Sequence, residues 1–256
     1  MSHQPLLARH GVEILQTSHQ SYRLDFLSTP AAPVLENLVA THRDDQGKPF
    51  SARDLELNRV AVRKVELLHH GIECYPVSWA QYLILSNEVL RDRVPSEECF
   101  RLLSVACLLK TADSRLILSF RSKNVSHYKE TWHVSAAGHI DLEGAVKSAS
   151  PFLQVMRELQ EELNVTALQL TGLRQLGLCR ECTSEVRPIE VCFLAQSDLT
   201  SQELMEGAKN AKDFWEGKVH SFSTREIVDK LQEERFVPSA AATIILALDS
   251  GFLPVS

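Results

Sequence analysis

The most constraining feature of this sequence is an amphipathic segment that begins at Ser150-Pro151 and ends near Leu163. Serine is a favoured N-cap and proline a favoured first helical residue, so this pair predicts the start of a helix. At 100° per residue, the apolar side chains of the segment fall on one narrow stripe. This stripe comprises Phe152, Val155, Met156, Leu159 and Leu163. We therefore expect one face of the helix to pack against a core.

The edge of the same helix carries an acidic cluster formed by Glu158, Glu161 and Glu162. The three carboxylates share an arc of about 100° beside the apolar stripe. Like charges at these spacings repel one another, and a hard divalent cation such as Mg²⁺ would remove that repulsion. The alternative interpretation is a solvated, exposed face, which is what most charge runs are. Arg157 lies one turn from Glu161 and is predicted to orient it.

Composition limits the kind of protein this can be. The chain has 256 residues, of which 44% are hydrophobic, enough for a sizeable core. Its formal net charge of −6 argues against broad binding of nucleic acid or of anionic membranes. No apolar run approaches the roughly 18 residues of a membrane span, and no signal peptide is evident. The six cysteines show no complete zinc or disulfide pattern, so we expect reduced thiols and a cytoplasmic protein.

Alternating strand and helix patterns predict an α/β domain over residues 99–256, preceded by a smaller α+β extension over residues 1–98. In the domain, a hairpin is expected from strands 102–110 and 115–121, followed by one strand at 132–137. Further strands are expected near 168–182, 188–196 and 218–222, with helices from about 200, at 224–231 and at 238–251. In the extension, we expect helices at 31–41 and 79–90, a turn at 44–49 and a strand at 58–68, for which a helix is the alternative.

The helix sequence RELQEE resembles the second half of the Nudix signature, G-x5-E-x7-R-E-U-x-E-E-x-G-U, in which U is an apolar residue. The residues that match are Arg157, Glu158, Leu159, Glu161, Glu162 and Val165. Gly138-His139-Ile140-Asp141 is similar to the start of the same motif. The resemblance implies a Nudix-type α/β/α sandwich with a mixed sheet. It also implies a Mg²⁺-dependent enzyme, with Mn²⁺ as a substitute, that cleaves nucleoside diphosphates linked to another group X.

The sequence departs from the signature in its loop. Gly138 lies 19 residues before Arg157, about five more than the signature has. The position of the first signature glutamate is Ala149, and Glu143 is an imperfect substitute. Asn164 replaces the closing glycine and tolerates the left-handed helix cap. Because the three acidic residues are intact, we expect an active site.

The resemblance assigns roles to individual residues. Glu158, Glu161 and Glu162 are expected to hold metal, with Glu161, Glu162 and Arg157 in the catalytic set. Gly138, Arg121 and Tyr82 are expected to meet substrate. Three further acids are candidates for a general base, Glu185, Glu190 and Glu216, and Lys123 is a second candidate for a phosphate contact. His133 and His139 are interpreted as structural, and Trp79 and Tyr82 as core residues or as a platform for a base.

Several stretches also resemble the animal UDP-glucose pyrophosphatase branch of the Nudix family. They are residues 78–87, 176–185, 198–204 and 238–246. This similarity implies that UDP-glucose or UDP-galactose is cleaved to UMP and a sugar 1-phosphate. Two alternatives remain open: a Nudix hydrolase of ADP-ribose, dinucleotides or coenzyme A, and a Nudix-fold nucleotide sensor or scaffold without turnover.

Overall fold

The computed structural model describes residues 4–17, 22–43, 47–66, 71–125, 127–142, 149–182 and 187–253. Its centre is β5 (Arg101–Lys110), an apolar strand with eight consecutive buried residues. This strand pairs in parallel with β10 (Ile189–Ser197) and antiparallel with β8 (Ala136–His139) and β6 (Leu116–Arg121). Because β5 is covered on both faces, it reads as a continuous hydrophobic run rather than an alternating one.

The remaining strands of the domain extend this mixed sheet on either side of β5. On one side β10 pairs with β9 (Leu170–Glu181), which pairs with β1 (Val12–Thr17). On the other side β6 pairs with β11 (Gly217–Phe222) and β7 (Trp132–His133). The sheet is therefore completed by a strand from near the start of the chain.

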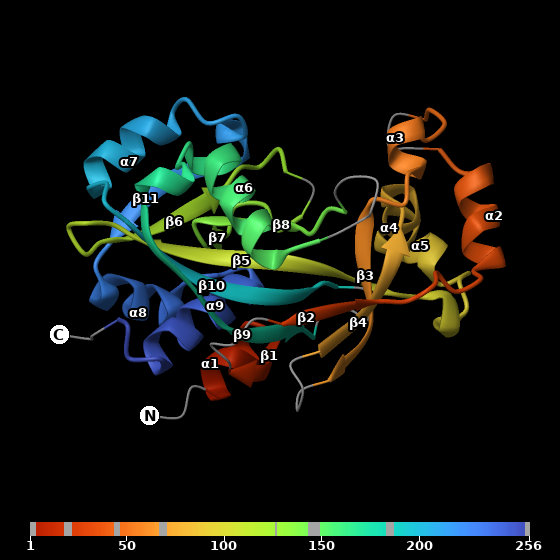
Figure 1. Cartoon of the computed structure of the whole chain (residues 1–256), viewed down its shortest axis with the longest axis horizontal. Helices are drawn as coiled ribbons and strands as arrows, with labels where there is room; N and C mark the ends of the chain where they lie inside the picture. Colours follow the sequence, from red (N-terminus) through yellow and green to blue (C-terminus); the bar gives the residue numbers. More distant parts are fainter. Residues whose placement is uncertain are drawn as a thin grey trace.

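Helices cover both faces of the sheet (Figure 1). One face carries α6 (Pro151–Leu163) and α7 (Ser201–Ala208), and the other carries α8 (Thr224–Glu233), α9 (Pro238–Asp249) and the short α1 (Gln4–Arg9). Two apolar clusters fill the layers, one under α8 and α9 and one under α6 and α7. The expected α/β architecture with a mixed sheet between helical layers is confirmed.

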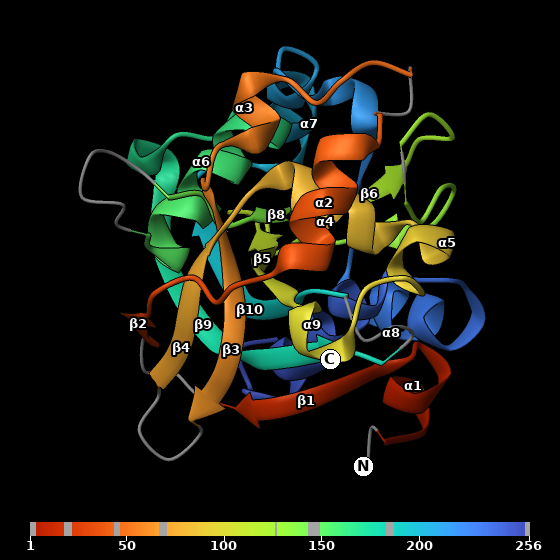
Figure 2. The ribbon, with the colours of Figure 1, turned by 90° about the vertical axis from the view of Figure 1, so that its right-hand side faces the viewer.

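The N-terminal region adds a smaller α+β unit beside the domain, also as expected. Its strands are β2 (Arg23–Phe26), β3 (Arg59–Glu66) and β4 (Gly71–Val77), and β3 joins the sheet through Ala61 and Val62 against β5. Figure 2 shows β3 and β4 side by side, with α2 and α4 beside them. The helices of this unit are α2 (Pro33–Thr41), α3 (Ala52–Leu55), α4 (Trp79–Ser86), α5 (Glu88–Arg91) and the 3-10 turn η2 (Ser96–Glu98).

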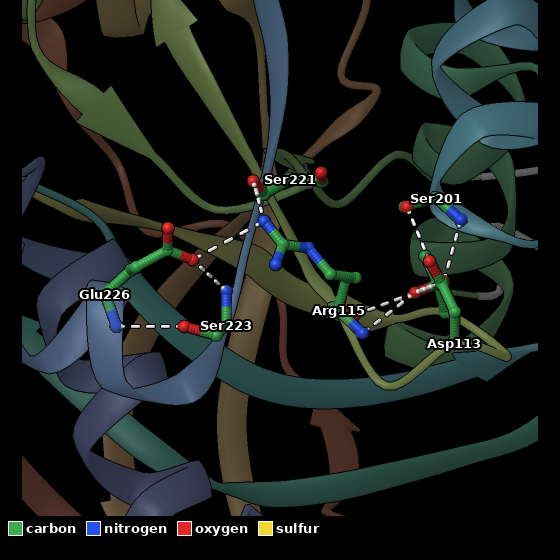
Figure 3. Close-up of polar contacts among 7 residues, drawn as sticks. Asp113, Arg115, Ser201, Ser221, Ser223 and Glu226 are labelled. Carbon is green, nitrogen blue, oxygen red and sulfur yellow. Dashed lines mark hydrogen bonds and ion pairs between the residues drawn. The ribbon is translucent and has the colours of Figure 1, made fainter.

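Polar contacts fix the turn of the β5–β6 hairpin to both helical layers (Figure 3). Asp113 accepts hydrogen bonds from the backbone N and the Oγ of Ser201 at 2.8 and 2.7 Å, at the start of α7. Arg115 donates to the Ser221 carbonyl at 2.8 Å and lies 3.4 Å from the Glu226 carboxylate of α8. These contacts connect the hairpin to segments about a hundred residues further along the chain.

Two predicted elements differ from the structure. The strand expected at 132–137 is two strands, β7 and β8, because the chain changes partner from β6 to β5 after His133. The helix expected at 79–90 breaks at Asn87, whose side chain accepts from the Leu90 backbone N and caps a second helix. Strands β1, β2 and β4 were not predicted. The boundary proposed near residue 98 stays a prediction, and residues 44–46 of the predicted turn lie outside the described residues.

All six cysteines are free thiols. Of the helices in the described residues, none is both long and apolar enough to cross a membrane.

Candidate active site

Helix α6 positions the acidic cluster through its burial and its two ends. Val155, Leu159 and Leu163 are buried against the sheet, as the apolar stripe predicts. The Ser150 hydroxyl accepts from the Leu153 backbone N, and Asn164 ends the helix in the left-handed conformation at φ 57°. The helix start, the apolar stripe and the C-terminal cap therefore agree with the sequence prediction. Because the apolar face is buried against the sheet, the position of the acidic edge of α6 is determined as well.

Glu158 and Glu162 lie against β8, and their environment disfavours ionisation. Glu162 Oε1 accepts a hydrogen bond from the Ala137 backbone N at 2.9 Å. Burial and the neighbouring Glu158 raise the pKa of Glu162 well above its ordinary value. Burial also raises the pKa of Glu158 to about 7, although a hydrogen bond from Gln154 opposes the shift. The two carboxyl groups thus share one crowded, poorly solvated position.

Gly138 is the residue of β8 that makes room for this arrangement. A Cβ atom built on Gly138 would overlap the carboxyl group of Glu158. The Glu158 carboxyl group can therefore occupy this position only beside a residue without a side chain. Gly138 also contributes to the wall of the adjoining cavity.

A fourth acid, Glu216, joins the cluster from a distant part of the chain. It is the last residue of the 3-10 turn η4 (Phe214–Glu216) and is one of the charges that raise the pKa of both Glu158 and Glu162. Burial raises the pKa of Glu216 as well. The Glu161 carboxylate lies 2.8 Å from Nζ of Lys212, which precedes η4 in the chain.

Next to the acidic cluster is a cavity of about 660 Å³. It brings together predicted residues from both parts of the chain, namely Trp79, Tyr82, Arg121, His133, Gly138, His139, Glu190 and Glu216. The Glu158 and Glu162 side chains contact Gly138 and Ala137, which form part of its wall. Glu143 and Glu185 lie outside the described residues, and Lys123 is exposed outside the cavity lining.

Arg121 is the cation of the cavity lining that acts on most of the acids. Its Nε donates to the His127 carbonyl at 3.2 Å, and its charge lowers the pKa values of Glu162, Glu190 and Glu216 against the opposing effect of burial. Burial raises the pKa of Glu190 to about 8, and the nearby Glu181 acts in the same direction. Glu190 is therefore mostly protonated at neutral pH and is able to donate a hydrogen bond.

The two histidines have the structural character that the sequence suggested. Burial lowers the pKa of His139 to about 3, and its Nδ1 lies 2.6 Å from Ser104 Oγ. Burial, with Arg121 acting in the same direction, lowers the pKa of His133 well below its ordinary value. Both rings are neutral at physiological pH and unsuited to act as bases there.

The N-terminal region supplies an aromatic wall. The ring centroids of Trp79 and Tyr82 are 5.0 Å apart, and those of Trp79 and His139 are 5.6 Å apart. Trp79 is half-buried, whereas Tyr82 is only 3% exposed. Tyr82 therefore lies in the wall mainly as a packing residue, and Trp79 offers the larger free ring surface.

The cavity lining also contains residues that the sequence analysis did not predict. The Arg187 guanidinium lies 5.4 Å from the Tyr128 ring centroid and 3.6 Å from the Glu181 carboxylate, to which the Tyr128 hydroxyl also donates. Lys129 adds a further positive charge at the cavity edge. The sequence pattern predicts only a polar loop at 122–131. The basic and aromatic residues of this loop are the signal that could have indicated a binding surface.

The acidic cluster suits a divalent cation by its chemistry. Its donors are carboxylate oxygens, and no Lys or Arg among the described residues forms an ion pair with Glu158, Glu162 or Glu216. Within the same part of the chain, no three Asp, Glu, His or Cys side chains are already arranged to hold a metal ion. The carboxylates therefore fit a hard cation in type and charge, and binding one requires them to turn toward it.

Comparison with known proteins gives distant similarities. No protein-family model matches the sequence, and no curated protein does. A mutT/nudix family protein from Listeria innocua is 17% identical, with a TM-score of 0.41, over 59% of this chain and 93% of that chain. An Ap4A hydrolase from C. elegans is 16% identical, with a TM-score of 0.38, over 59% and 97%. A MutT protein from Methanosarcina mazei is 14% identical, with a TM-score of 0.38, over 58% and 94%. At these scores the function must be argued from the site itself.

Proposed function

We propose that this protein is a Nudix-type hydrolase that uses a divalent cation to cleave the diphosphate bridge of a nucleoside diphosphate linked to another group. The observation that carries the proposal is a cavity that combines cationic side chains with an adjoining group of carboxylates. Glu158 and Glu162 lie beside Gly138 and Ala137 of the cavity wall, and the lining also contains Arg121, Lys129 and Arg187. A diphosphate with bound metal needs both features, since the metal requires anionic oxygens and the phosphates require cations.

The metal would be held by Glu158, Glu161 and Glu162 of α6. When bound, Mg²⁺ or Mn²⁺ supplies Lewis-acid polarisation of phosphoryl oxygens and lowers the pKa of water. Glu161 must first release Lys212, its partner at 2.8 Å. Burial disfavours the ionised forms of Glu158 and Glu162, as their raised pKa values show. A bound cation would therefore stabilise these two carboxylates strongly.

The other acids take separate roles in proton transfer and binding. Glu216 lines the cavity beside the acidic cluster, so we assign it as the base that accepts a proton from the attacking water. Glu190, protonated at neutral pH, donates a hydrogen bond to a phosphate or sugar oxygen. Arg121 lies between these groups and neutralises negative charge that develops on the phosphates.

For the substrate we propose UDP-glucose or UDP-galactose, cleaved to UMP and a sugar 1-phosphate. The support is the resemblance of the four short stretches named above to that branch, together with the aromatic wall, where uracil can lie against Trp79. Cavities of a few hundred cubic ångströms hold ligands of this size. The cavity of about 660 Å³ falls in that range.

A substrate panel with Mg²⁺ tests the proposal. Wild type is expected to hydrolyse UDP-glucose or UDP-galactose, and Glu162→Gln to lose at least 100-fold in kcat, since it removes a metal-facing charge. Glu206→Gln on α7 is the control because its exposed carboxylate pairs with Lys209, one turn away on the same helix. Turnover of ADP-ribose, dinucleotides or coenzyme A alone would replace the UDP-sugar assignment. Nucleotide binding without turnover of any substrate would instead indicate a sensor.

A further inference from the structure

An ion-pair network connects the N-terminal region to the acidic cluster. Its centre is Asp141, just after β8, which lies between the guanidinium groups of Arg59 and Arg157. Arg157 Nη2 is 2.7 Å from Asp141 Oδ2, and Arg59 forms an ion pair with Asp141 Oδ1. The Arg59 side chain is 20% exposed, that of Asp141 28% and that of Arg157 30%, so this is not a fully solvated surface contact.

Gln154 carries the network from Asp141 to Glu158. Its Oε1 accepts hydrogen bonds from the Asp141 backbone N, at 3.1 Å, and from Arg157 Nη2. Since both of these partners are donors, the carbonyl oxygen must face them and the amide nitrogen must face the other way. That nitrogen donates to Glu158 Oε1. Gln154 is only 4% exposed, so water has little access to its amide.

Backbone hydrogen bonds and a contact with Trp79 also connect this network to the N-terminal region. Arg59 and Asp141 form an isolated antiparallel bridge, and the Leu142 backbone N donates to the Asn58 carbonyl at 3.0 Å. The Arg59 guanidinium lies 5.5 Å from the Trp79 ring centroid. A continuous set of contacts therefore runs from the cavity wall at Trp79, through Arg59, Asp141 and Gln154, to Glu158.

We propose that Asp141 is a positioning residue for Glu158, and that Arg59 makes the N-terminal region part of the catalytic unit. Without the Asp141 charge, Arg59 and Arg157 would repel each other in a half-buried setting. Arg157 would then lose its ion pair with residue 141 and move from its place beside Gln154. Gln154 would keep the hydrogen bond from the backbone N of residue 141 but lose the one from Arg157, so its amide would hold Glu158 less firmly. This inference rests on the proposed function for its effect on catalysis, but not for its effect on Gln154.

Asp141→Asn tests the proposal with a side chain of the same size. We expect the Mn²⁺ dissociation constant, measured by electron paramagnetic resonance of free Mn²⁺, to rise about tenfold, and kcat to fall 10- to 100-fold, as for other partners that orient metal ligands. Arg59→Met should give a similar change. The double variant should be no worse than the more affected single variant, because both act through one network.

A measurement on Gln154 separates this proposal from the proposed function. In ¹H–¹⁵N spectra without metal or substrate, the Gln154 side-chain amide is the signal absent from Gln154→Met. It should be shifted and slow to exchange in wild type and move toward free-glutamine values in Asp141→Asn. Glu226→Gln, which removes a carboxylate from Arg115, is the matched control and should leave this signal, Mn²⁺ binding and turnover unchanged.

The outcomes distinguish the two proposals. If wild type neither binds Mn²⁺ nor turns over any substrate, the proposed function fails. The Gln154 amide signal would then still show whether Asp141 positions Gln154. If Asp141→Asn leaves the amide signal and the Mn²⁺ dissociation constant within twofold of wild type, the positioning role is overturned. Should Asp141→Asn fail to fold, Arg59→Met decides by the same criteria.

Discussion

At the scale of single residues, Gly138 decides where the carboxyl group of Glu158 can lie. A methyl group on Gly138 would overlap the end of the flexible Glu158 side chain, not backbone atoms. We therefore expect Gly138→Ala to fold with little change in Tm but to lose at least tenfold in kcat. Gly207→Ala is the control, since its Cβ would meet nothing within 4 Å, and it should keep full activity. Equal activity of the two variants would show that Glu158 does not need this position.

Glu190 gives a pH dependence with a defined sign. Its pKa is about 8 in the folded protein and near 4.5 when unfolded. The folded state therefore keeps a proton that the unfolded state releases, and Glu190 lowers stability progressively as pH rises from about 4.5 to 8. Relative to Glu190→Gln, the unfolding free energy of wild type should fall by a few kcal/mol between pH 5 and pH 9, at about 1.4 kcal/mol per pKa unit. Urea denaturation at both pH values measures this, and a constant difference between the proteins would contradict it.

At the scale of elements, α6 shows how a helix end can be specified by one residue. Asn164 adopts φ 57°, a conformation that asparagine and glycine accept more easily than other residues. We expect Asn164→Ala to lower the unfolding free energy by about 1 kcal/mol and Asn164→Gly to preserve or raise it. Lys209, which ends α7 in the right-handed conformation, is the control, and Lys209→Ala should change stability little. Equal stability of Asn164→Ala and Asn164→Gly in urea denaturation would argue against the cap.

At the scale of the whole molecule, the cavity belongs to both parts of the chain. Gly138, Arg121 and Glu216 come from the domain, and Trp79 comes from the N-terminal region. The pairing of β3 with β5 and the ion pair of Arg59 with Asp141 hold the two parts together near the site. The N-terminal region is therefore expected to act in substrate binding and in orienting Glu158, and the variants at Asp141 and Arg59 examine the second role.

The sequence alone determined the features that depend on local pattern. Helix α6 is defined by its apolar stripe, its Ser150-Pro151 start and its Asn164 end. Burial of one face and capping both depend on residues that are close together in the sequence. The same local logic predicted the β5–β6 hairpin and the acidic edge of Glu158, Glu161 and Glu162. It could not separate β7 from β8, because the change of partner strand after His133 has no local signature.

Only the tertiary structure decided which distant side chains meet. Glu216 was one of three equal candidates until η4 placed it beside Glu158 and Glu162. Arg157 was expected to orient Glu161, but its described bonds go to Asp141 and Gln154, and Lys212 holds Glu161 instead. Long-range ion pairs and close approaches arise from packing of elements far apart in the chain. The local sequence shows which side chains are able to form ion pairs. Which of them become partners depends on how the distant elements pack.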